Sequence, residues 1–211
     1  MLGDPEDGSG RLLYPVASRK MTPAQVRRRE AAVDQALRDL ATRDYESIQM
    51  REIAERAGIA LATLYRYFPS KEYLFAVALD RWVGRIRAEV GAAALHGTAS
   101  ERLGSVLHRG VDLVAKVPNW FSVIVALASS SDPLARRPLQ DATRTIHRMM
   151  TDAMFDVDDN DARMIASIMA AMLQQGWHAI YLEGSSLSGL HDEIDSTIEV
   201  IFRLPRSNTS A

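Results

Sequence analysis

Apolar side chains recur along this sequence at the spacing of helices and seldom in strict alternation. One such face runs through residues 50–57 at positions i, i+3, i+4 and i+7, and it consists of Met50, Ile53, Ala54 and Ala57. Alternating runs of Val, Ile and Thr bounded by Asn-Gly or Asp-Gly turns, which are typical of paired strands, are nearly absent. The pattern therefore predicts an all-α fold.

Start and stop signals divide the chain into nine predicted helices. Proline at a first helical position, a hydroxyl side chain before an apolar run and glycine after one mark most of the boundaries. We expect helices at about 22–42, 50–57, 61–68 and 71 to past 90, one between breaks at 97–100 and 117–119 and one after them, and three at about 133–155, 162–183 and 190–203. Residues 1–21, which are rich in Gly, Pro and Asp, are predicted to form a disordered tail.

Charge is unevenly distributed, although the whole chain has a net charge of only −2. Residues 11–71 contain 12 basic and 7 acidic side chains, a balance of +5, whereas residues 72–211 contain 13 and 17, a balance of −4. A basic first third on an acidic body is typical of a small DNA-facing module joined to a larger domain without a DNA role. A chance fluctuation would produce the same imbalance.

The sequence carries no sign of secretion or of a membrane span. Its N-terminal stretch MLGDPEDGSGRLLYP has acidic residues and glycines where a signal peptide needs a basic and then an apolar segment. No apolar run approaches the ~20 residues that cross a bilayer. Cysteine is absent, which excludes disulfide and thiolate chemistry. We therefore expect a cytoplasmic protein without a membrane partner.

The predicted helices at 50–57 and 61–68 are joined by a short turn at Gly58, which is the pattern of a helix-turn-helix. The second helix of such a unit enters a DNA major groove about 12 Å wide, so one face must pack inward and the other must offer hydrogen bonds. Leu64 and Phe68 are assigned to the inward face. Thr63 and Tyr67 are predicted to point away from it, toward DNA.

The segment MREIAERAGIALATLYRYFPSKEYLF, residues 50–75, resembles the DNA-binding signature of TetR-family transcriptional repressors. The resemblance rests on the turn glycine, the Thr-Leu-Tyr-x-Tyr-Phe run and the Ser-Lys that follows it. It implies the nine-helix TetR-like architecture, with an N-terminal three-helix DNA-binding domain at 22–70 and a helical ligand-binding and dimerisation domain at 71–204. The second domain agrees with the family in length and helical character.

The resemblance also implies which side chains bind the DNA operator. Thr63 and Tyr65 would contact the backbone or base edges, and Tyr67 would reach a phosphate through its hydroxyl. Lys71 would pair with a phosphate, assisted by the positive N-terminus of its helix. The tyrosine rings could instead be buried in the core.

Three further positions carry the remaining DNA contacts that the resemblance implies. Arg51 would contact a phosphate or a guanine. Leu61 and Ala62 occupy base-reading positions, where they can offer only apolar contact, for instance to a thymine methyl group. Leu61 could instead pack at the edge of the core. Gln49 stands where the family often has a helix-capping threonine, so no cap contact is expected there.

The second domain is rich in adaptable apolar side chains. Six of the nine methionines lie between Met149 and Met172, which is consistent with ordinary core packing or with a pocket for an apolar molecule. The resemblance favours the pocket and a small apolar effector. The candidate lining residues are Trp120, Phe121, His147, Met150, Met154, Met172, Gln174, Trp177, His178 and Tyr181.

The predicted helices at 162–183 and 190–203 carry broad apolar faces. In the family the last two helices build a four-helix dimer interface, so the resemblance implies a homodimer. A dimer is also what places two recognition helices about 34–36 Å apart on a palindromic site. Ordinary packing within the chain would explain the same apolar faces.

Enzymatic function is the weaker reading of this sequence. DVDDND, residues 156–161, resembles a calcium loop but has Asp161 where such a loop needs glycine, so we assign it to a helix cap. No nucleotide, zinc-protease or nucleophile-elbow motif is present, and neither a cofactor nor a metal is expected. We expect a repressor whose dimer leaves its operator when the effector binds. The alternative is a helical small-molecule-binding or adaptor protein without a DNA role.

Overall fold

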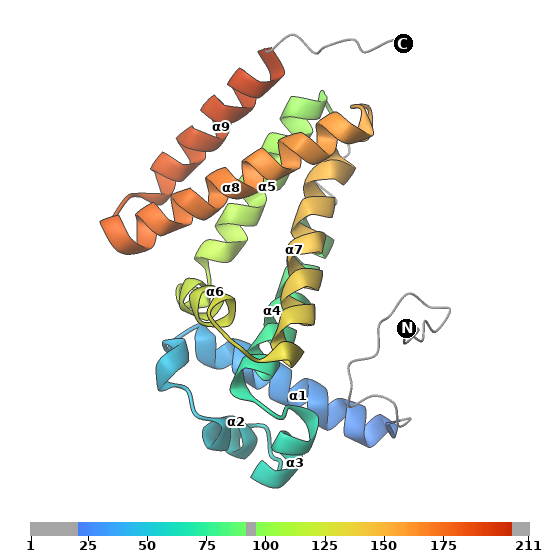
Figure 1. Ribbon diagram of the computed structural model, residues 1–211, viewed down its shortest axis with the longest axis vertical. Coiled ribbons are helices and arrows are strands. Elements are labelled where there is room, and N and C mark those ends of the chain that lie inside the picture. The colour runs from blue at the N-terminus through green and yellow to red at the C-terminus, as the bar shows by residue number, and fades with distance from the viewer. Residues whose placement is uncertain (1–20, 92–95, 204–211) are drawn as a thin grey trace.

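The computed structural model describes residues 21–91 and 96–203. Of the predicted disordered tail, residues 1–20 lie outside the described residues. Met21, the last residue of that prediction, is described and packs against the core. Within the described ranges the chain forms nine α-helices, one short 3-10 helix and no strand, which confirms the all-α prediction (Figure 1). The α-helices are α1 (Pro23–Leu40), α2 (Met50–Arg56), α3 (Leu61–Tyr67), α4 (Lys71–Val90), α5 (Ala99–Ala115), α6 (Trp120–Ala128), α7 (Pro133–Ala153), α8 (Asp159–Glu183) and α9 (Leu187–Arg203), and the 3-10 helix is η1 (Tyr45–Ser47).

Side-chain caps explain most of the helix boundaries. Thr22 accepts a hydrogen bond from the Gln25 backbone while the Gln25 side chain bonds back to Thr22, so α1 begins at Pro23 as expected. α8 begins three residues earlier than predicted because Asp158 accepts hydrogen bonds from the backbone of Asn160 and Asp161 at 2.9 and 3.3 Å. η1 was not predicted, since a single three-residue turn carries no periodicity.

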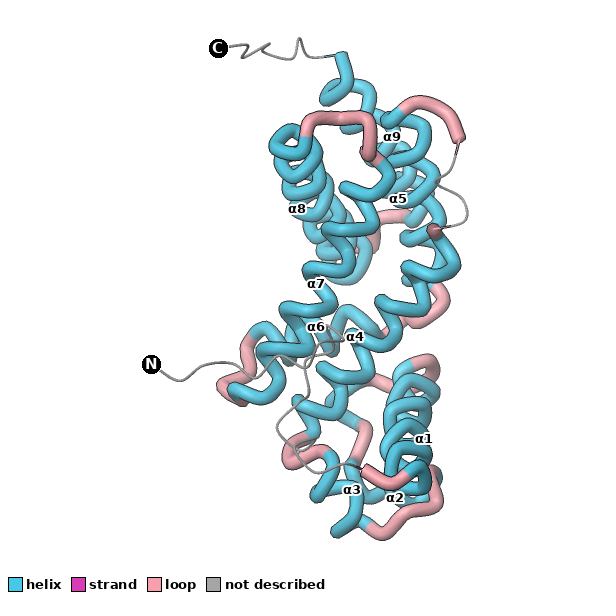
Figure 2. Tube along the Cα trace, turned by 90° about the vertical axis from the view of Figure 1, so that its right-hand side faces the viewer, coloured by secondary structure: helices cyan, strands magenta, loops and turns pink. Residues whose placement is uncertain are grey.

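The helices gather at two ends of an elongated molecule, which α4 and α7 connect (Figures 1 and 2). α1, α2 and α3 lie at one end, and α5, α8 and α9 lie at the other. The first half of α4 is buried among α1 to α3 through Tyr73, Leu74 and Phe75. Its second half belongs to the opposite end, where Ile86 and Val90 pack against α5 and α7.

α6 lies between the two ends and contributes to both. Val123 and Leu127 are buried in the same core as α1 to α3. Phe121, on another face of α6, is buried in the core of α5, α7, α8 and α9. Among the described residues no single helix is long and apolar enough to cross a membrane, and only α5 and α6, bent by 96°, pass such a test as a pair.

Gly58 and Gly84 give a matched test of the turn between α2 and α3. Gly58 has φ 67°, which strains any residue with a Cβ, whereas Gly84 lies within α4, and an added Cβ would meet no atom within 4 Å at either position. Gly58→Ala should therefore lower the free energy of unfolding by about 1–2 kcal/mol. Gly84→Ala should raise it by about 0.5–1 kcal/mol. Urea unfolding of both variants checks this, and changes of the same sign would contradict the turn assignment.

Candidate DNA-binding surface and effector cavity

The helix-turn-helix lies at one tip of the molecule, where α3 packs on α2 and α1 (Figure 2). Leu64 and Phe68 are fully buried and fix α3 to this core, as the sequence pattern predicts. Phe68 also carries the Arg29 guanidinium 4.9 Å above its ring centroid. α3 is thus anchored along one side only, which leaves its other side free.

The free side of α3 presents apolar, hydroxyl and guanidinium groups together. Tyr65 is 46% exposed, Leu61 is 37% exposed, and Ala62 and Arg66 are exposed as well. Thr63 is half-buried beside them. The partial exposure of Leu61 leaves both of its predicted roles open, contact with DNA or packing at the edge of the core. This combination can offer hydrogen bonds to phosphates and bases and apolar contact to a thymine methyl group.

Tyr67 does not belong to this exposed face, so its predicted orientation is wrong. Its side chain is only 3% exposed, and its hydroxyl is buried without a hydrogen-bond partner in the described part of the chain. The reason is helical phase: three residues turn a helix by about 300°, which brings Tyr67 within about 60° of Leu64. Leu64, Tyr67 and Phe68 therefore form one buried face.

Lys71 begins α4 as predicted, but its ammonium is already bound within the chain. Nζ donates to the backbone oxygen of Tyr45 at 2.5 Å and lies 4.1 Å above the centroid of the Tyr45 ring. Burial lowers the pKa of Lys71 below its ordinary value, although Glu46 and Glu72 oppose this. Lys71 thus joins α4 to η1.

The side chain of Arg51, on α2, is exposed, as a contact with DNA requires. Its Nε lies 3.1 Å from Glu55 in an ion pair whose two side chains are mostly exposed, so the guanidinium can exchange its partner at little cost. Gln49 makes no side-chain cap at the start of α2, as expected. α2 is held instead by ion pairs from Arg56 to Asp39 at 2.6 Å and from Arg43 to Glu52 at 2.5 Å.

A cavity of about 600 Å³ is lined by residues of α4, α5, α6, α7 and α8. Of the ten residues predicted to bind an effector, six line it: Trp120, Phe121, His147, Met150, Gln174 and Trp177. The other four are not among its lining residues. Met154 is buried in the core, Met172 packs against that core, and His178 and Tyr181 contact the ring of Phe121 with centroid separations of 4.9 and 4.8 Å.

The sequence did not reveal the walls that α4 and α5 contribute. On α4 these are Leu79, Trp82, Val83 and Ile86, and on α5 they include Leu107 and Val111. Their spacing is that of any buried helix face, so a cavity wall cannot be told from solid core without knowing what faces it.

The cavity has a largely apolar interior, to which Trp120 of α6 adds a buried indole N–H that has no hydrogen-bond partner in the described part of the chain. Thr143 and His147 belong to α7, and Ser167 and Gln174 to α8; among the described lining residues none is Asp, Glu, Lys or Arg. The Thr143 carbonyl, 3.0 Å from His147 Nδ1, can only accept, so Nδ1 carries a proton. Thr143, Ser167 and Gln174 are all exposed, which places an opening between α7 and α8.

Hydrogen bonds join the start of α6, and the start of α7 that follows it, to the DNA-binding end of the molecule. Asn119, the residue before α6, donates its side-chain amide to the Leu40 oxygen at the end of α1 at 3.0 Å. Asp132 follows α6 and caps α7, and it also accepts a hydrogen bond from Ser70, the cap of α4. A displacement of α6 would therefore be felt at the C-terminus of α1 and at the turn between α3 and α4.

The apolar faces of α8 and α9 are mostly used within the chain. Ile165, Met169, Ile194 and Ile198 are buried. A separate stripe on α8 remains exposed, with Met164, Ile168 and Leu182 at 56%, 45% and 73% exposure. The described residues contain no group of three or more His, Asp or Glu side chains placed to hold a metal.

Comparisons with known proteins agree with this geometry. Residues 32–78 match the model of bacterial regulatory proteins of the tetR family. The transcriptional repressor KstR of Mycolicibacterium smegmatis is 32% identical over 156 residues, which cover 71% of this chain and 76% of that protein.

Two solved structures share the fold. A TetR regulator from Rhodococcus sp. RHA1 superimposes with a TM-score of 0.65 at 22% identity, covering 89% of this chain and 99% of that one. FadR from Bacillus subtilis, solved with stearoyl-CoA, gives 0.65 at 18% identity, covering 84% and 99%. The helix-turn-helix, the all-α architecture and the similarity to KstR together show that the chain belongs to the TetR family of bacterial transcriptional regulators.

Proposed function

We propose that this regulator is a ligand-responsive repressor: a homodimer binds a palindromic operator through residues 22–70 and leaves it when an apolar effector enters the domain at 71–204. The observation that carries the proposal is the position of α6, which forms a wall of the cavity and whose N-terminal cap residue, Asn119, is hydrogen-bonded to the end of α1. The similarity of this chain to proteins named as transcriptional repressors supports repression. The protein would act in the cytoplasm, by binding and without a catalytic step.

For DNA recognition we propose a division between reading and positioning. The exposed side of α3 would lie in the major groove, with Arg66 able to bond a guanine and Leu61 or Ala62 able to contact a thymine methyl group. Tyr65 and Thr63 would bond the backbone. Arg51 would reach a phosphate from α2, and Lys71 would order η1 and add positive charge close to the DNA.

For the effector we propose a molecule with a long apolar part. The interior walls offer no charge among the described lining residues, and the volume of about 600 Å³ falls in the range of drug-sized pockets. The FadR structure with stearoyl-CoA supports an acyl chain as one such apolar part. Polar atoms of the effector would meet Gln174 and His147 at the opening between α7 and α8.

For the switch we propose that the effector displaces α6. Trp120, Phe121 and Ile124 face the cavity, so a ligand that needs more room must press on this wall. The displacement would strain the Asn119 bond to α1 and the Asp132 bond to Ser70, and it would reorient α3 in each subunit. The response then equals the difference in effector affinity between the DNA-bound and released geometries.

A comparison of two Tyr→Phe variants tests the DNA surface. Tyr65→Phe should weaken binding about 3- to 10-fold, because an exposed hydroxyl loses one hydrogen bond to DNA. Tyr67→Phe should leave affinity unchanged, because that hydroxyl is buried. Gel shifts would use a duplex selected from random sequence by the wild-type protein. Equal effects in both variants would contradict the assigned faces, and failure to select any duplex would favour the adaptor alternative.

Asn119→Ala tests the route through α6. The variant should bind DNA and effector separately but should lose most of the effector-induced release, since α6 is no longer bonded to α1. Typical coupling corresponds to a 5- to 150-fold change in affinity, and we expect a reduction to about 2- to 3-fold. Stearoyl-CoA is the first probe in the gel-shift titration, and Asn160→Ala on α8 is the matched control. Full release in the Asn119 variant would contradict this route.

Acidic substitutions on α8 test the homodimer. Ile168→Glu combined with Leu182→Glu should produce a monomer, because two exposed apolar contacts become like charges facing each other across a two-fold axis. Sedimentation velocity at micromolar concentration measures this. Val125→Glu, on an equally exposed apolar residue of α6, should leave the dimer intact. A wild-type monomer would overturn the dimeric part of the proposal.

A further inference from the structure

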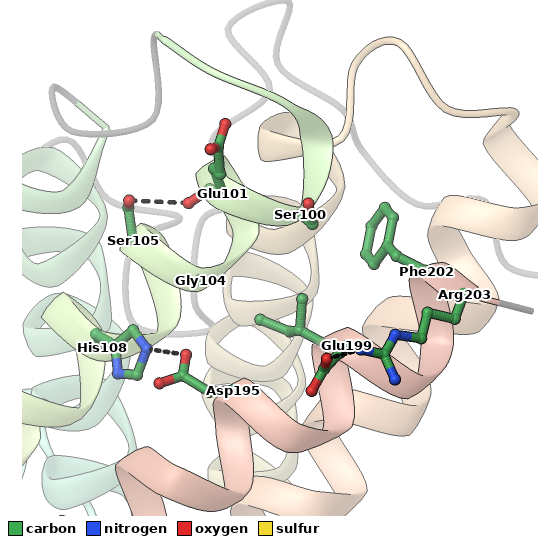
Figure 3. Close-up of a pocket in the computed structure, with 10 residues that line it drawn as sticks. Ser100, Glu101, Gly104, Ser105, His108, Asp195, Glu199, Phe202 and Arg203 are labelled. Carbon is green, nitrogen blue, oxygen red and sulfur yellow. Dashed lines mark hydrogen bonds and ion pairs between the residues drawn. The ribbon is translucent and has the colours of Figure 1, made fainter.

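Two histidines face each other where α5 meets α9. His108 Nδ1 lies 2.6 Å from His191 Nδ1, and the ring centroids are 4.9 Å apart with planes 24° apart. The outer nitrogen of each ring faces a carboxylate: His108 Nε2 lies 2.8 Å from Asp195, and His191 Nε2 lies 3.2 Å from Asp112. Figure 3 shows His108 on α5 reaching Asp195 on α9. Four titratable groups thus form one hydrogen-bonded row.

The number of ring protons decides whether this row is complete. Carboxylates only accept, so each Nε2 must carry a proton, and the short Nδ1 to Nδ1 contact needs one proton between the rings. Three protons on four nitrogens satisfy all the contacts, which makes one histidine cationic and the other neutral. With two protons, either two lone pairs meet at 2.6 Å or one lone pair faces a carboxylate. With four protons, two N–H groups oppose each other.

We propose that His108 and His191 form a single-proton clamp, which holds α9 on α5 only while the pair carries one positive charge. The clamp weakens on both sides of its optimal pH: below it because a second charge forces the rings apart, and above it because a contact loses its proton. The titration belongs to the pair as a unit.

Other charged side chains lie on the same two helices and on the helices packed against them. On α5 and α9 the neighbouring charges are Glu101, Arg109, Asp192, Glu193, Glu199 and Arg203, of which Glu101 is bonded to Thr98 and Glu199 to Arg203. The helices packed against α5 and α9 carry further charged or titratable side chains. Arg87 and Asp152 pair with each other, His147 is bonded to Thr143, and His178 packs on Phe121. Glu183 lies at the end of α8.

The histidine pair is connected to the cavity through α5. Leu107 and Val111, on the same helix as His108, line the cavity. On the other side, α9 packs against α8 through Leu190 and Ile194. The proton shared between the rings therefore fixes one wall of the cavity relative to α9. This follows from the geometry and does not depend on the proposed repressor function.

Nitrogen-15 NMR of histidine-labelled protein tests the clamp directly. Near pH 6.5 we expect one coupled pair of rings with three protonated nitrogens and one unprotonated nitrogen, and we expect His108→Gln to abolish the coupled signals. Two independent neutral rings at that pH would overturn the proposal. A pair that loses its signature on treatment with EDTA and regains it with Zn²⁺ would also overturn it, because a metal would then join the rings.

Thermal unfolding across pH 5–9 gives the second measurement. The unfolding midpoint of the wild type should exceed that of His191→Gln by about 2–4 °C at the optimum, and the excess should shrink toward both ends of the range. The exposed His96→Gln variant is the matched control and should follow the wild type at every pH. A constant excess, or one that only rises or only falls with pH, would contradict a single-proton clamp.

Discussion

The structure depends on the burial of α6 between two groups of helices. Every residue of this helix except Ser122 is apolar, and Phe121, Val123 and Leu127 are buried, while Val125 is 46% exposed. Val123 and Leu127 complete the core around α1 to α3, whereas Trp120 and Phe121 complete the other end. Neither end can close its core without α6. The two ends are therefore coupled by packing before any ligand is considered.

Polar contacts at its ends give this packing a direction. Apolar contacts alone would let α6 slide, since dispersion is weak and nondirectional for each atom pair. The Asn119 bond to Leu40 joins the start of α6 to the end of α1, and the Ser70 bond to Asp132 joins the start of α4 to the start of α7. Lys71 adds a third tie between α4 and η1, the element that α6 also contacts.

Local signals in the sequence predicted the fold because each is settled within a few residues. Thr22 and Ser70 cap helices as expected, and Gly58 takes the positive φ that ends α2. The inward Leu64 and Phe68 were also predicted. The exposed side of α3 was predicted only in part, because Tyr67 was assigned to the wrong helical phase. The cavity was found through its aromatic and methionine residues, while its α4 and α5 walls share the periodicity of solid core. A helix face that lines a cavity and one that packs in solid core have the same apolar periodicity. They differ only in their contacts with distant segments, which the periodicity does not reveal.

The cavity walls restrict which part of an effector can enter. A charged group placed among Leu107, Phe121 and Ile124 would lose its hydration without gaining a partner, at a cost of several kcal/mol. A charged effector must therefore keep its charge at the opening between α7 and α8, where Thr143 and Gln174 are exposed. Its apolar part then extends inward toward α6, the wall that is tied to the DNA-binding end. On the proposed route, the length of that apolar part, more than the nature of the charged group, determines how far α6 is displaced.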